Sequence, residues 1–236
     1  MKAIVSIPTY NEAENIEALV YQILDLPVDI GVIVVDDNSP DGTGKIVDRL
    51  HIEFPNRVYH LHRDNRAGFA AAHKAGLKYV LRNTDAEYIL TMDADFSHDP
   101  KYIPKMLDKM EKHDIIIGSR YVKSGGTKNW SIGRKLLSRS ANIYARTILG
   151  LSAMDCTGGF RCYRRKVIEH INVEHLYSHG YGYLIETLFK CQGSGYKIGE
   201  IPIIFMDRQY GKSKLSKSIA VESFFLVLKL RLRGKK

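Results

Sequence analysis

Short apolar runs alternate with amphipathic stretches along the first half of the chain, and this alternation restricts the fold more than any other feature. The apolar runs have the length of buried strands, and the stretches between them repeat apolar residues at helical spacing. Strands are predicted over residues 3–7, 32–35, 58–61, 88–91 and 115–118. Helices are predicted over 16–24, around 46–50, over 69–81 and after Pro100. Asn11 and Glu14 have capping-box spacing before the first helix. The pattern predicts an α/β fold, a mostly parallel mixed sheet flanked by helices on both faces.

The second half of the chain is less regular. We expect a mobile loop over 124–129, a helix over 132–149, a strand over 161–163, a helix over 183–191 and a strand over 198–205. No internal repeat, low-complexity segment or linker divides the chain. The sequence therefore predicts one domain over residues 1–214 and a basic amphipathic helix over residues 215–236.

Polar residues follow four predicted strands, at the edge of the sheet where ligands bind in such folds. These stretches are residues 8–12, 36–41, 93–99 and 119–120. In extended backbone, Asp93 and Asp95 would point to the same side and repel each other. A divalent cation with oxygen ligands relieves such repulsion, and Mg2+ usually completes its shell with substrate phosphates. An acidic loop that only caps a helix is the alternative, but four matching loops favour a metal–diphosphate site.

The chain is basic, with a formal net charge of +9 in 236 residues. This charge predicts an anionic partner such as a nucleotide, a nucleic acid or an anionic lipid surface, and an ordinary basic surface is the alternative. Three cysteines without metal-like spacing, and a predicted strand directly after the first residues, predict a reducing compartment and no targeting segment. No apolar run is long enough to span a bilayer as a helix. We therefore expect a cytoplasmic protein.

Missing motifs argue against several nucleotide-binding classes. The chain lacks Gly-x-x-x-x-Gly-Lys-Ser/Thr, and Gly-x-Gly-x-x-Gly does not follow the first predicted strand. Neither a Ser-His-Asp nor a Cys-His arrangement can be proposed from order or spacing. Instead, a glycine-containing loop rich in cations, residues 207–214, follows the last predicted strand. Cations of this kind, combined with acidic strand ends, predict a nucleotide diphosphate ligand.

Five motifs together resemble the family-2 inverting glycosyltransferases, and within them most closely the dolichol-phosphate (polyprenol-phosphate) mannosyltransferases. They occur in order over nearly the whole chain: Pro8-Thr9-Tyr10-Asn11-Glu12, Val35-Asp36-Asp37-Asn38-Ser39, Asp93-Ala94-Asp95 with His98 and Pro100, Gly118-Ser119-Arg120, and Arg208-x-Tyr210-Gly211-x-Ser213-Lys214. The resemblance implies a GT-A fold. It also implies transfer of mannose from GDP-mannose to dolichyl or polyprenyl phosphate at the cytoplasmic face of a membrane.

The resemblance further implies roles for individual residues. The nucleotide sugar would be bound by Pro8, Tyr10, Glu12, Val35, Asp37, Asp93, Ala94 and Asp95. Mg2+ or Mn2+ would be held by Asp93, by Asp95 most directly, and by Ser97, which stands where many members carry Gln. The donor diphosphate would contact Arg120, Arg208 and Lys214, which form the catalytic set with Asp95. The acceptor phosphate would meet Arg120, Arg134 and Ser138.

The chemistry that the resemblance implies needs no general base. A lipid monophosphate carries roughly −1.5 to −2 charge at neutral pH, so it is already a nucleophile. The metal and the cations would stabilise charge on the departing GDP, and direct attack would invert the anomeric carbon. Glu186 lies in the predicted helix 183–191. It either caps a neighbouring loop or takes part in catalysis.

The C-terminal segment suggests how such an enzyme reaches a lipid. Residues 219–230 are rich in apolar side chains and are followed by Arg231, Arg233, Lys235 and Lys236. The segment is too short to span a bilayer but suits peripheral contact with a membrane interface. A helix docked on the core is the alternative, and a small membrane subunit is a partner that some related enzymes use.

Two other functions stay open. The first is transfer from UDP-glucose or another sugar nucleotide to undecaprenyl phosphate. The second, from a different class, is nucleic-acid binding by a basic module. Acidic strand ends argue against nucleic acid, because without a bound metal they repel a polyanion.

Overall fold

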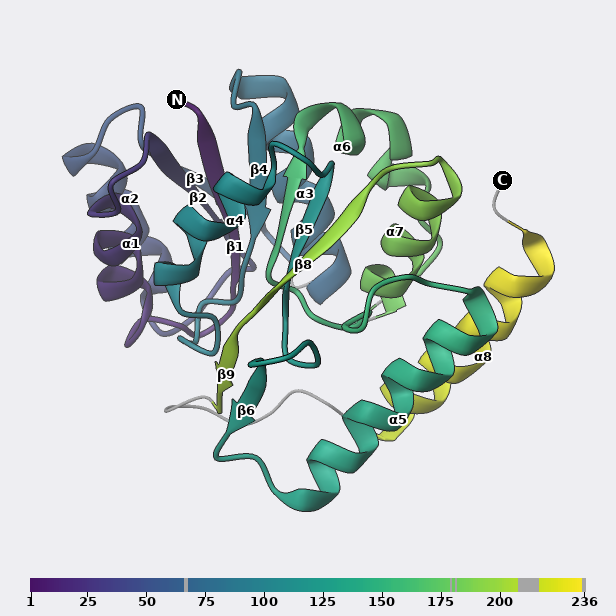
Figure 1. Cartoon of the computed structure of the whole chain (residues 1–236). Coiled ribbons are helices and arrows are strands. Elements are labelled where there is room, and N and C mark those ends of the chain that lie inside the picture. The colour runs from purple at the N-terminus through teal and green to yellow at the C-terminus, as the bar shows by residue number, and fades with distance from the viewer. Residues whose placement is uncertain (66–67, 179, 181, 208–216, 235–236) are drawn as a thin grey trace.

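The computed structural model describes residues 1–65, 68–178, 180, 182–207 and 217–234, without the side chains of residues 217–223. Within this part of the chain, seven strands form a sheet in the order β3-β2-β1-β4-β7-β5-β8 (Figure 1). They are β1 (Ala3–Thr9), β2 (Ile30–Asp36), β3 (Val58–His62), β4 (Tyr88–Thr91), β5 (Ile115–Ser119), β7 (Arg161–Arg164) and β8 (Ile198–Pro202). β7 is antiparallel to β4 and β5, and the other neighbours are parallel. A separate parallel pair joins β6 (Gly126–Lys128) and β9 (Ile204–Met206).

Helices cover both faces of this sheet. One face carries α1 (Ile16–Leu24), α2 (Thr43–Glu53), the 3₁₀ turn η1 (Pro100–Tyr102) and α4 (Ile103–Lys109). The other carries α3 (Phe69–Asn83), α6 (Arg165–Ile171), the turn η2 (Val173–His175) and α7 (Gly182–Gly193). α5 (Ile132–Leu149) and α8 (Lys217–Arg233) pack side by side at the periphery (Figure 1). In the described part of the chain, no helix is both long and apolar enough to cross a bilayer.

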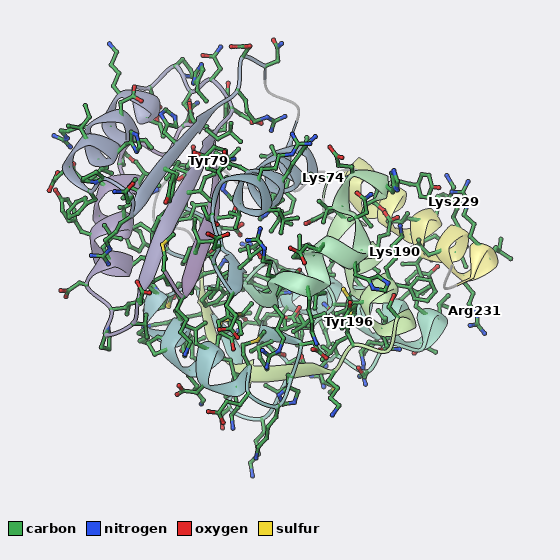
Figure 2. All side chains as sticks on the ribbon, turned by 90° about the horizontal axis from the view of Figure 1, so that it is seen from above. Lys74, Tyr79, Lys190, Tyr196, Lys229 and Arg231 are labelled. Atoms are coloured by element: carbon green, nitrogen blue, oxygen red, sulfur yellow. The ribbon has the colours of Figure 1, made fainter. Side chains whose placement is uncertain are left out.

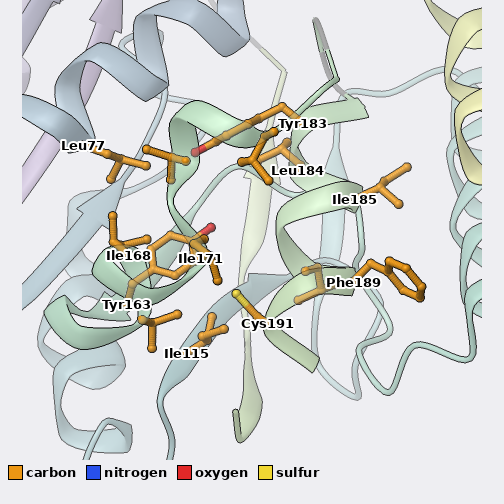
Figure 3. Close-up of a cluster of buried hydrophobic side chains, with 14 of the residues drawn as sticks. Leu77, Ile115, Tyr163, Ile168, Ile171, Tyr183, Leu184, Ile185, Phe189 and Cys191 are labelled. Carbon is orange, nitrogen blue, oxygen red and sulfur yellow. The ribbon is translucent and has the colours of Figure 1, made fainter. Parts of the chain in front are cut away.

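Alternate strand residues point to opposite faces, so the same strands contribute to two hydrophobic cores. In β2, Val32 and Val34 lie in the core under α1 and α2, whereas Ile33 and Val35 lie in the core under α3. All of β2 is buried, as expected for a parallel strand covered on both faces. Figure 3 shows part of the second core, where Tyr163 of β7 lies among the aliphatic side chains. The sheet is thus fixed from both sides, and its carboxyl-end loops have a rigid base.

The sequence predictions of strands and helices mostly match these elements. The predicted strand 88–91 and helix 132–149 coincide with β4 and α5. The predicted loop 124–129 is wrong in part, because it contains β6, and the predicted strand 198–205 is two strands separated by Ile203. The Ile203 N–H donates to the carbonyl oxygen of Ser119 at 3.0 Å, and its own carbonyl accepts from the Gly126 N–H at 3.0 Å. The chain therefore passes from the large sheet to the small one at Ile203.

The predicted capping box before α1 is wrong. The N-cap residue is Asn15, and its side chain makes no capping hydrogen bond. Asn11 adopts a left-handed φ of 57°, and its N–H donates to Ser39 Oγ at 2.9 Å. The loop after β1 is therefore shaped by the neighbouring loop after β2 rather than by the helix that follows it.

Candidate active site

The loops after β1 and β2 are fastened together. Thr9 Oγ1 donates to Asp36 Oδ1 at 2.9 Å, and the Asp37 N–H donates to the carbonyl oxygen of Thr9 at 3.1 Å. Three successive backbone amides of the first loop donate to side chains of the second: Asn11 to Ser39 at 2.9 Å, Glu12 to Thr43 at 3.0 Å and Ala13 to Asp41 at 3.0 Å. We call residues 8–13 and 35–43 the paired loops. Because their backbones are hydrogen-bonded to each other, they form a preorganised edge.

The paired loops contain the residues predicted to hold the nucleoside. Pro8 and Val35 are register partners in adjacent strands, and Tyr10, Glu12 and Asp37 follow them at the same edge. Their contact with a ligand remains a prediction.

Arg63 is a residue of this edge whose role the sequence did not reveal. It follows β3, and its Nη1 donates to Asp37 Oδ1 at 2.7 Å. Asp37 is buried and Arg63 is mostly buried, so this ion pair holds the carboxylate in one orientation. The cluster of polar residues after the third predicted strand was the available signal, but spacing alone does not identify the partner.

Asp93 and Asp95 lie in a turn beyond the end of β4, where residues 94–98 bend instead of continuing the strand. The turn arises because Asp95 Oδ1 accepts from the Ser97 N–H at 3.1 Å and Phe96 has a left-handed φ of 56°. The Asp93 N–H donates to Nδ1 of His98 at 3.0 Å.

His98 fixes this acidic turn as a neutral side chain. Burial lowers the pKa of His98 to about 4, so the ring is uncharged at neutral pH and Nδ1 can accept. The ring lies 5.1 Å from that of Phe160 and 5.3 Å from that of Phe205, measured between centroids. A buried neutral imidazole engaged by backbone is a positioning group here rather than a base.

The acidic turn fits the predicted metal in the chemistry of its donors. Asp95 is buried, Asp93 is partly exposed, and the hydroxyl of Ser97 is buried without a hydrogen-bond partner among the described residues. Two carboxylates and a hydroxyl are hard oxygen ligands, the type that Mg2+ and Mn2+ take. The three predicted ligands are therefore brought into one turn.

Residues 155–160, which precede β7, pack against the acidic turn. Thr91 Oγ1 donates to the carbonyl oxygen of Gly159 at 2.7 Å, and a Cβ placed on Gly159 would lie 3.8 Å from Asp93 Oδ1. The next residue, Phe160, stacks on His98. This segment therefore forms a wall of the site.

Arg120 and Asp155 form a buried ion pair in that wall. Nε and Nη2 of Arg120 donate to the two carboxylate oxygens of Asp155, both at 2.7 Å, and Nη2 also donates to Thr157 Oγ1 at 2.8 Å. Burial raises the pKa of Asp155, but the Arg120 charge and its hydrogen bonds outweigh burial and lower it. The sequence did not single out Asp155, although an acidic residue in the otherwise uncharged stretch 151–160 was a usable signal.

Of the three residues predicted to meet the acceptor phosphate, Arg134 and Ser138 lie on α5, and Arg120 belongs to this ion pair. Nη1 of Arg134 donates to Asp207 Oδ1 at 2.7 Å, and its guanidinium carbon lies 4.1 Å from the centroid of the Trp130 ring. Ser138 Oγ accepts from the Tyr121 hydroxyl at 2.7 Å. Arg134 therefore reaches Asp207, the first residue of the predicted basic loop. Arg208 and Lys214 lie outside the described residues.

Glu186 caps a loop, as one of its two interpretations predicted. Its buried carboxylate accepts from the backbone N–H groups of Tyr177 and Ser178, at 3.1 and 2.8 Å, and from the Ser178 hydroxyl at 2.5 Å. With both oxygens engaged inside the protein, Glu186 acts structurally.

Comparison with known proteins identifies the family. Residues 4–171 match the model of glycosyl transferase family 2. The chain belongs to this family. Among its curated relatives is polyprenol monophosphomannose synthase of Mycolicibacterium smegmatis, 40% identical over 235 residues, which cover 99% of this chain and 88% of the relative. Another is undecaprenyl-phosphate mannosyltransferase of Micrococcus luteus, 37% identical over 223 residues, which cover 94% and 91%.

Solved structures share the fold at low sequence identity. Glucosyl-3-phosphoglycerate synthase from Mycobacterium tuberculosis, crystallised with Mn2+, UDP and glucosyl-3-phosphoglycerate, matches with a TM-score of 0.66 and 19% identity, over 98% of this chain and 79% of that one. A mannosyltransferase from Pyrobaculum calidifontis in complex with GDP-Man and Mn2+ matches with 0.59 and 17%, over 95% and 69%. The chain is a family-2 glycosyltransferase with the GT-A fold, as its motifs predicted.

Proposed function

We propose that this glycosyltransferase transfers mannose from GDP-mannose to a polyprenyl or dolichyl phosphate, with inversion at the anomeric carbon. The observation that carries the proposal is the 40% identity, over almost the whole chain, to a polyprenol monophosphomannose synthase. A second relative at 37% identity is named for mannosyl transfer to undecaprenyl phosphate. The two names share a mannosyl group and a polyprenyl phosphate acceptor.

The donor would lie along the edge from the paired loops to the acidic turn. Guanosine would contact the paired loops, where Asp37 is held by Arg63. Asp93, Asp95 and Ser97 would hold Mg2+ or Mn2+, and the ion would supply charge stabilisation for the diphosphate. The solved mannosyltransferase that contains GDP-Man and Mn2+ supports this choice of donor and metal. Arg208 and Lys214 would add positive charge to the diphosphate.

The reaction would be a direct displacement. An oxygen of the lipid phosphate bonds to the anomeric carbon of mannose while the bond from that carbon to GDP breaks, so GDP leaves with the electron pair. The phosphate is already anionic and gives up no proton that needs a base. Two buried residues agree with chemistry that lacks a protein base: His98 is neutral with Nδ1 engaged, and Glu186 is committed to a loop.

The acceptor phosphate would be received by Arg134 and Ser138 on α5. Arg134 is paired with Asp207, so an incoming phosphate would exchange one anionic partner for another. Arg120 is close to both substrate regions, but its bidentate pair with Asp155 assigns it first to holding the wall of the site. Its predicted contact with either phosphate would add to that role.

The lipid would be reached through the helix pair α5–α8, which supports peripheral contact with the cytoplasmic face of a membrane. Val227 and Leu230 of α8 dock on the core, yet other apolar side chains of both helices are exposed. The exposed ones include Ile132, Leu136, Leu137 and Ile143 on α5 and Phe224, Phe225, Leu228 and Leu232 on α8. Figure 2 shows Lys229 and Arg231 of α8 on the outside of the molecule. Apolar side chains bordered by cations suit an anionic lipid interface, and a small membrane subunit is the alternative occupant.

The donor and metal can be tested in one assay. The purified chain is incubated with polyprenyl phosphate and either labelled GDP-mannose or labelled UDP-glucose, with Mg2+, with Mn2+ or with EDTA. We expect a labelled lipid from GDP-mannose only when a divalent ion is present, with inverted anomeric configuration by NMR. Preferential use of UDP-glucose, or full activity in EDTA, would contradict the proposal.

A further inference from the structure

A second group of side chains of the kind that bind metal ions lies at the carboxyl ends of β2 and β3, apart from the acidic turn after β4. Asp36 ends β2, His62 ends β3, and the two are register partners. His60, two residues before His62, points to the same side of the strand. In the described part of the chain, one ligand atom from each of the three side chains lies within 4.8 Å of the others. His62 Nδ1 is 3.9 Å from Asp36 Oδ2.

His60 has the arrangement of a metal-binding histidine. Its Nδ1 lies 2.7 Å from Oδ1 of Asp48 on α2, and a carboxylate at that distance keeps the proton on Nδ1. Nε2 then carries a lone pair. This nitrogen is buried without a hydrogen-bond partner among the described residues, and the side chain is only 9% exposed. Leaving such an acceptor without a partner is unfavourable, and a cation at Nε2 would remove that cost.

Asp36 is equally well oriented. Its Oδ1 accepts from Thr9 Oγ1 at 2.9 Å and from Ser39 Oγ at 2.5 Å, and its Oδ2 accepts from the Ser39 N–H at 3.0 Å. Oδ2 retains a second lone pair on the side of His62. Glycine at position 44 leaves room there, since a Cβ would lie 3.5 Å from Asp36 Oδ2 and 3.7 Å from His60 Cε1.

We propose that Asp36, His60 and His62 form a binding site for Zn2+ or a chemically similar transition-metal ion. Two imidazoles and one carboxylate match the ligand preference of Zn2+ and Co2+, whereas Mg2+ prefers oxygen alone. His60 and Asp36 are held in place, and His62, half exposed, is the ligand that closes on the ion. Water would complete the coordination.

The site would connect elements that carry the nucleotide-binding edge. Asp36 is bonded to Thr9 of β1, His60 to Asp48 of α2, and His62 precedes Arg63, which holds Asp37. An ion bound here would therefore link β2 to β3 and restrict the motion of the paired loops. The site makes no use of Asp93 or Asp95, and its existence does not depend on the identity of the sugar donor.

Titration of the full chain with Zn2+ tests the proposal. The protein is first treated with a chelator, then titrated by calorimetry in excess Mg2+, which occupies sites built from oxygen ligands. We expect one tight Zn2+ per chain, and visible absorption bands when Co2+ replaces Zn2+. Wild-type protein that binds Zn2+ no more tightly than the double variant His60→Ala/His62→Ala would overturn the proposal.

Single variants locate the ion. His62→Ala should weaken Zn2+ binding by at least about tenfold, and Asp48→Asn by about tenfold through His60. Both side chains are at least half exposed, so neither change should alter folding, which circular dichroism checks. His175→Ala, at an exposed histidine on η2, and Asp95→Asn should leave the affinity unchanged. Loss of Zn2+ binding in Asp95→Asn with retention in His62→Ala would assign the ion to the acidic turn and refute the site.

Discussion

The paired loops and the helix pair α5–α8, the regions proposed to meet the donor and the membrane, differ in how far their side chains are already in contact with the rest of the protein. In the paired loops, side chains and backbone amides are hydrogen-bonded to each other, so the edge is set before a ligand arrives. In the helix pair, large apolar side chains such as Leu137 and Phe225 remain in water. A small polar ligand rewards preorganisation, because few groups are left to be ordered on binding. A membrane rewards exposed apolar area, which gains free energy only when lipid covers it.

The largest effect is expected at Asp95, a predicted metal ligand in the acidic turn. Asp95→Ala should reduce turnover by about 10²-fold or more, because charge on the departing diphosphate loses its counter-ion. Product formation and thermal unfolding would be measured together, and the fold should persist. Asp85→Ala, an exposed acidic residue before β4, is the matched control. Undiminished turnover in Asp95→Ala would show that the acidic turn does not hold a catalytic ion.

The next effect concerns stability at the wall of the site. Asp155→Ala leaves the Arg120 guanidinium buried without its carboxylate and should cost about 3–5 kcal/mol in the free energy of unfolding. Glu17→Ala breaks the exposed pair with Arg49 and should cost only about 0–1 kcal/mol. Urea denaturation compares the two. Equal losses in the free energy of unfolding would mean that the buried pair matters no more to stability than the exposed one.

Buried His73 should make the free energy of unfolding depend on pH. Burial lowers the pKa of His73 to about 3 from 6.5, so between these values the unfolded chain binds a proton that the folded chain refuses. Its contribution to stability is complete above about pH 6.5 and is lost as the pH falls, by up to about 1.4 kcal/mol per pH unit. His73→Leu should flatten the curve of unfolding free energy against pH in this window, whereas the exposed His175→Leu should not. An unchanged slope in His73→Leu would show that His73 is not held neutral.

Substitutions on the exposed face of the helix pair should change only membrane binding. Leu137→Glu combined with Phe225→Glu removes apolar area from the interface and should lower the affinity for anionic vesicles by about tenfold or more. Vesicle flotation measures this. The control is Ile52→Glu on α2, at a residue that is 79% exposed and lies outside the helix pair. It measures how much an added negative charge alone weakens binding to anionic vesicles. Comparable loss in both would mean that added negative charge, rather than the helix pair, decides binding.

The smallest effect tests preorganisation itself. Arg63→Ala leaves Asp37 in place but without its ion pair, and should weaken GDP binding by roughly 1 kcal/mol, about fivefold in Kd. Calorimetry with GDP checks this, and Arg49→Ala, which breaks the exposed pair between Arg49 of α2 and Glu17 of α1, is the control. Tighter binding in Arg63→Ala would mean that Arg63 competes with the base for Asp37.

The fold could be predicted because its signal is periodic and local. Buried runs such as 32–35 are recognisable one at a time, and their alternation with helices leaves few arrangements. The strand-end motifs likewise located the paired loops and the acidic turn. The sequence could not reveal that Asp155 reaches Arg120, since the two lie 35 residues apart. They come together because Arg120 follows β5, Asp155 precedes β7, and these strands pair in the sheet.

Other features depend on competition between neighbours. Asn11 looked like a helix cap, but Ser39 offered its amide a partner from another loop. In α5, helical spacing of apolar residues is the same whether a face docks or stays in water, so the exposure of Leu136 could not be foreseen. The half-buried Arg134 similarly acquires its partner, Asp207, from a distant strand end.

One reversed strand explains how the site is enclosed. β7 runs opposite to β4 and β5, so its first residue, Arg161, is level with Thr91 at the end of β4. A strand in the common direction would bring its leading segment to the far side of the sheet. Running backwards, β7 instead delivers residues 155–160 into the gap between two neighbouring loops. The change of direction thus lets a single sheet edge receive chain from both ends of its strands.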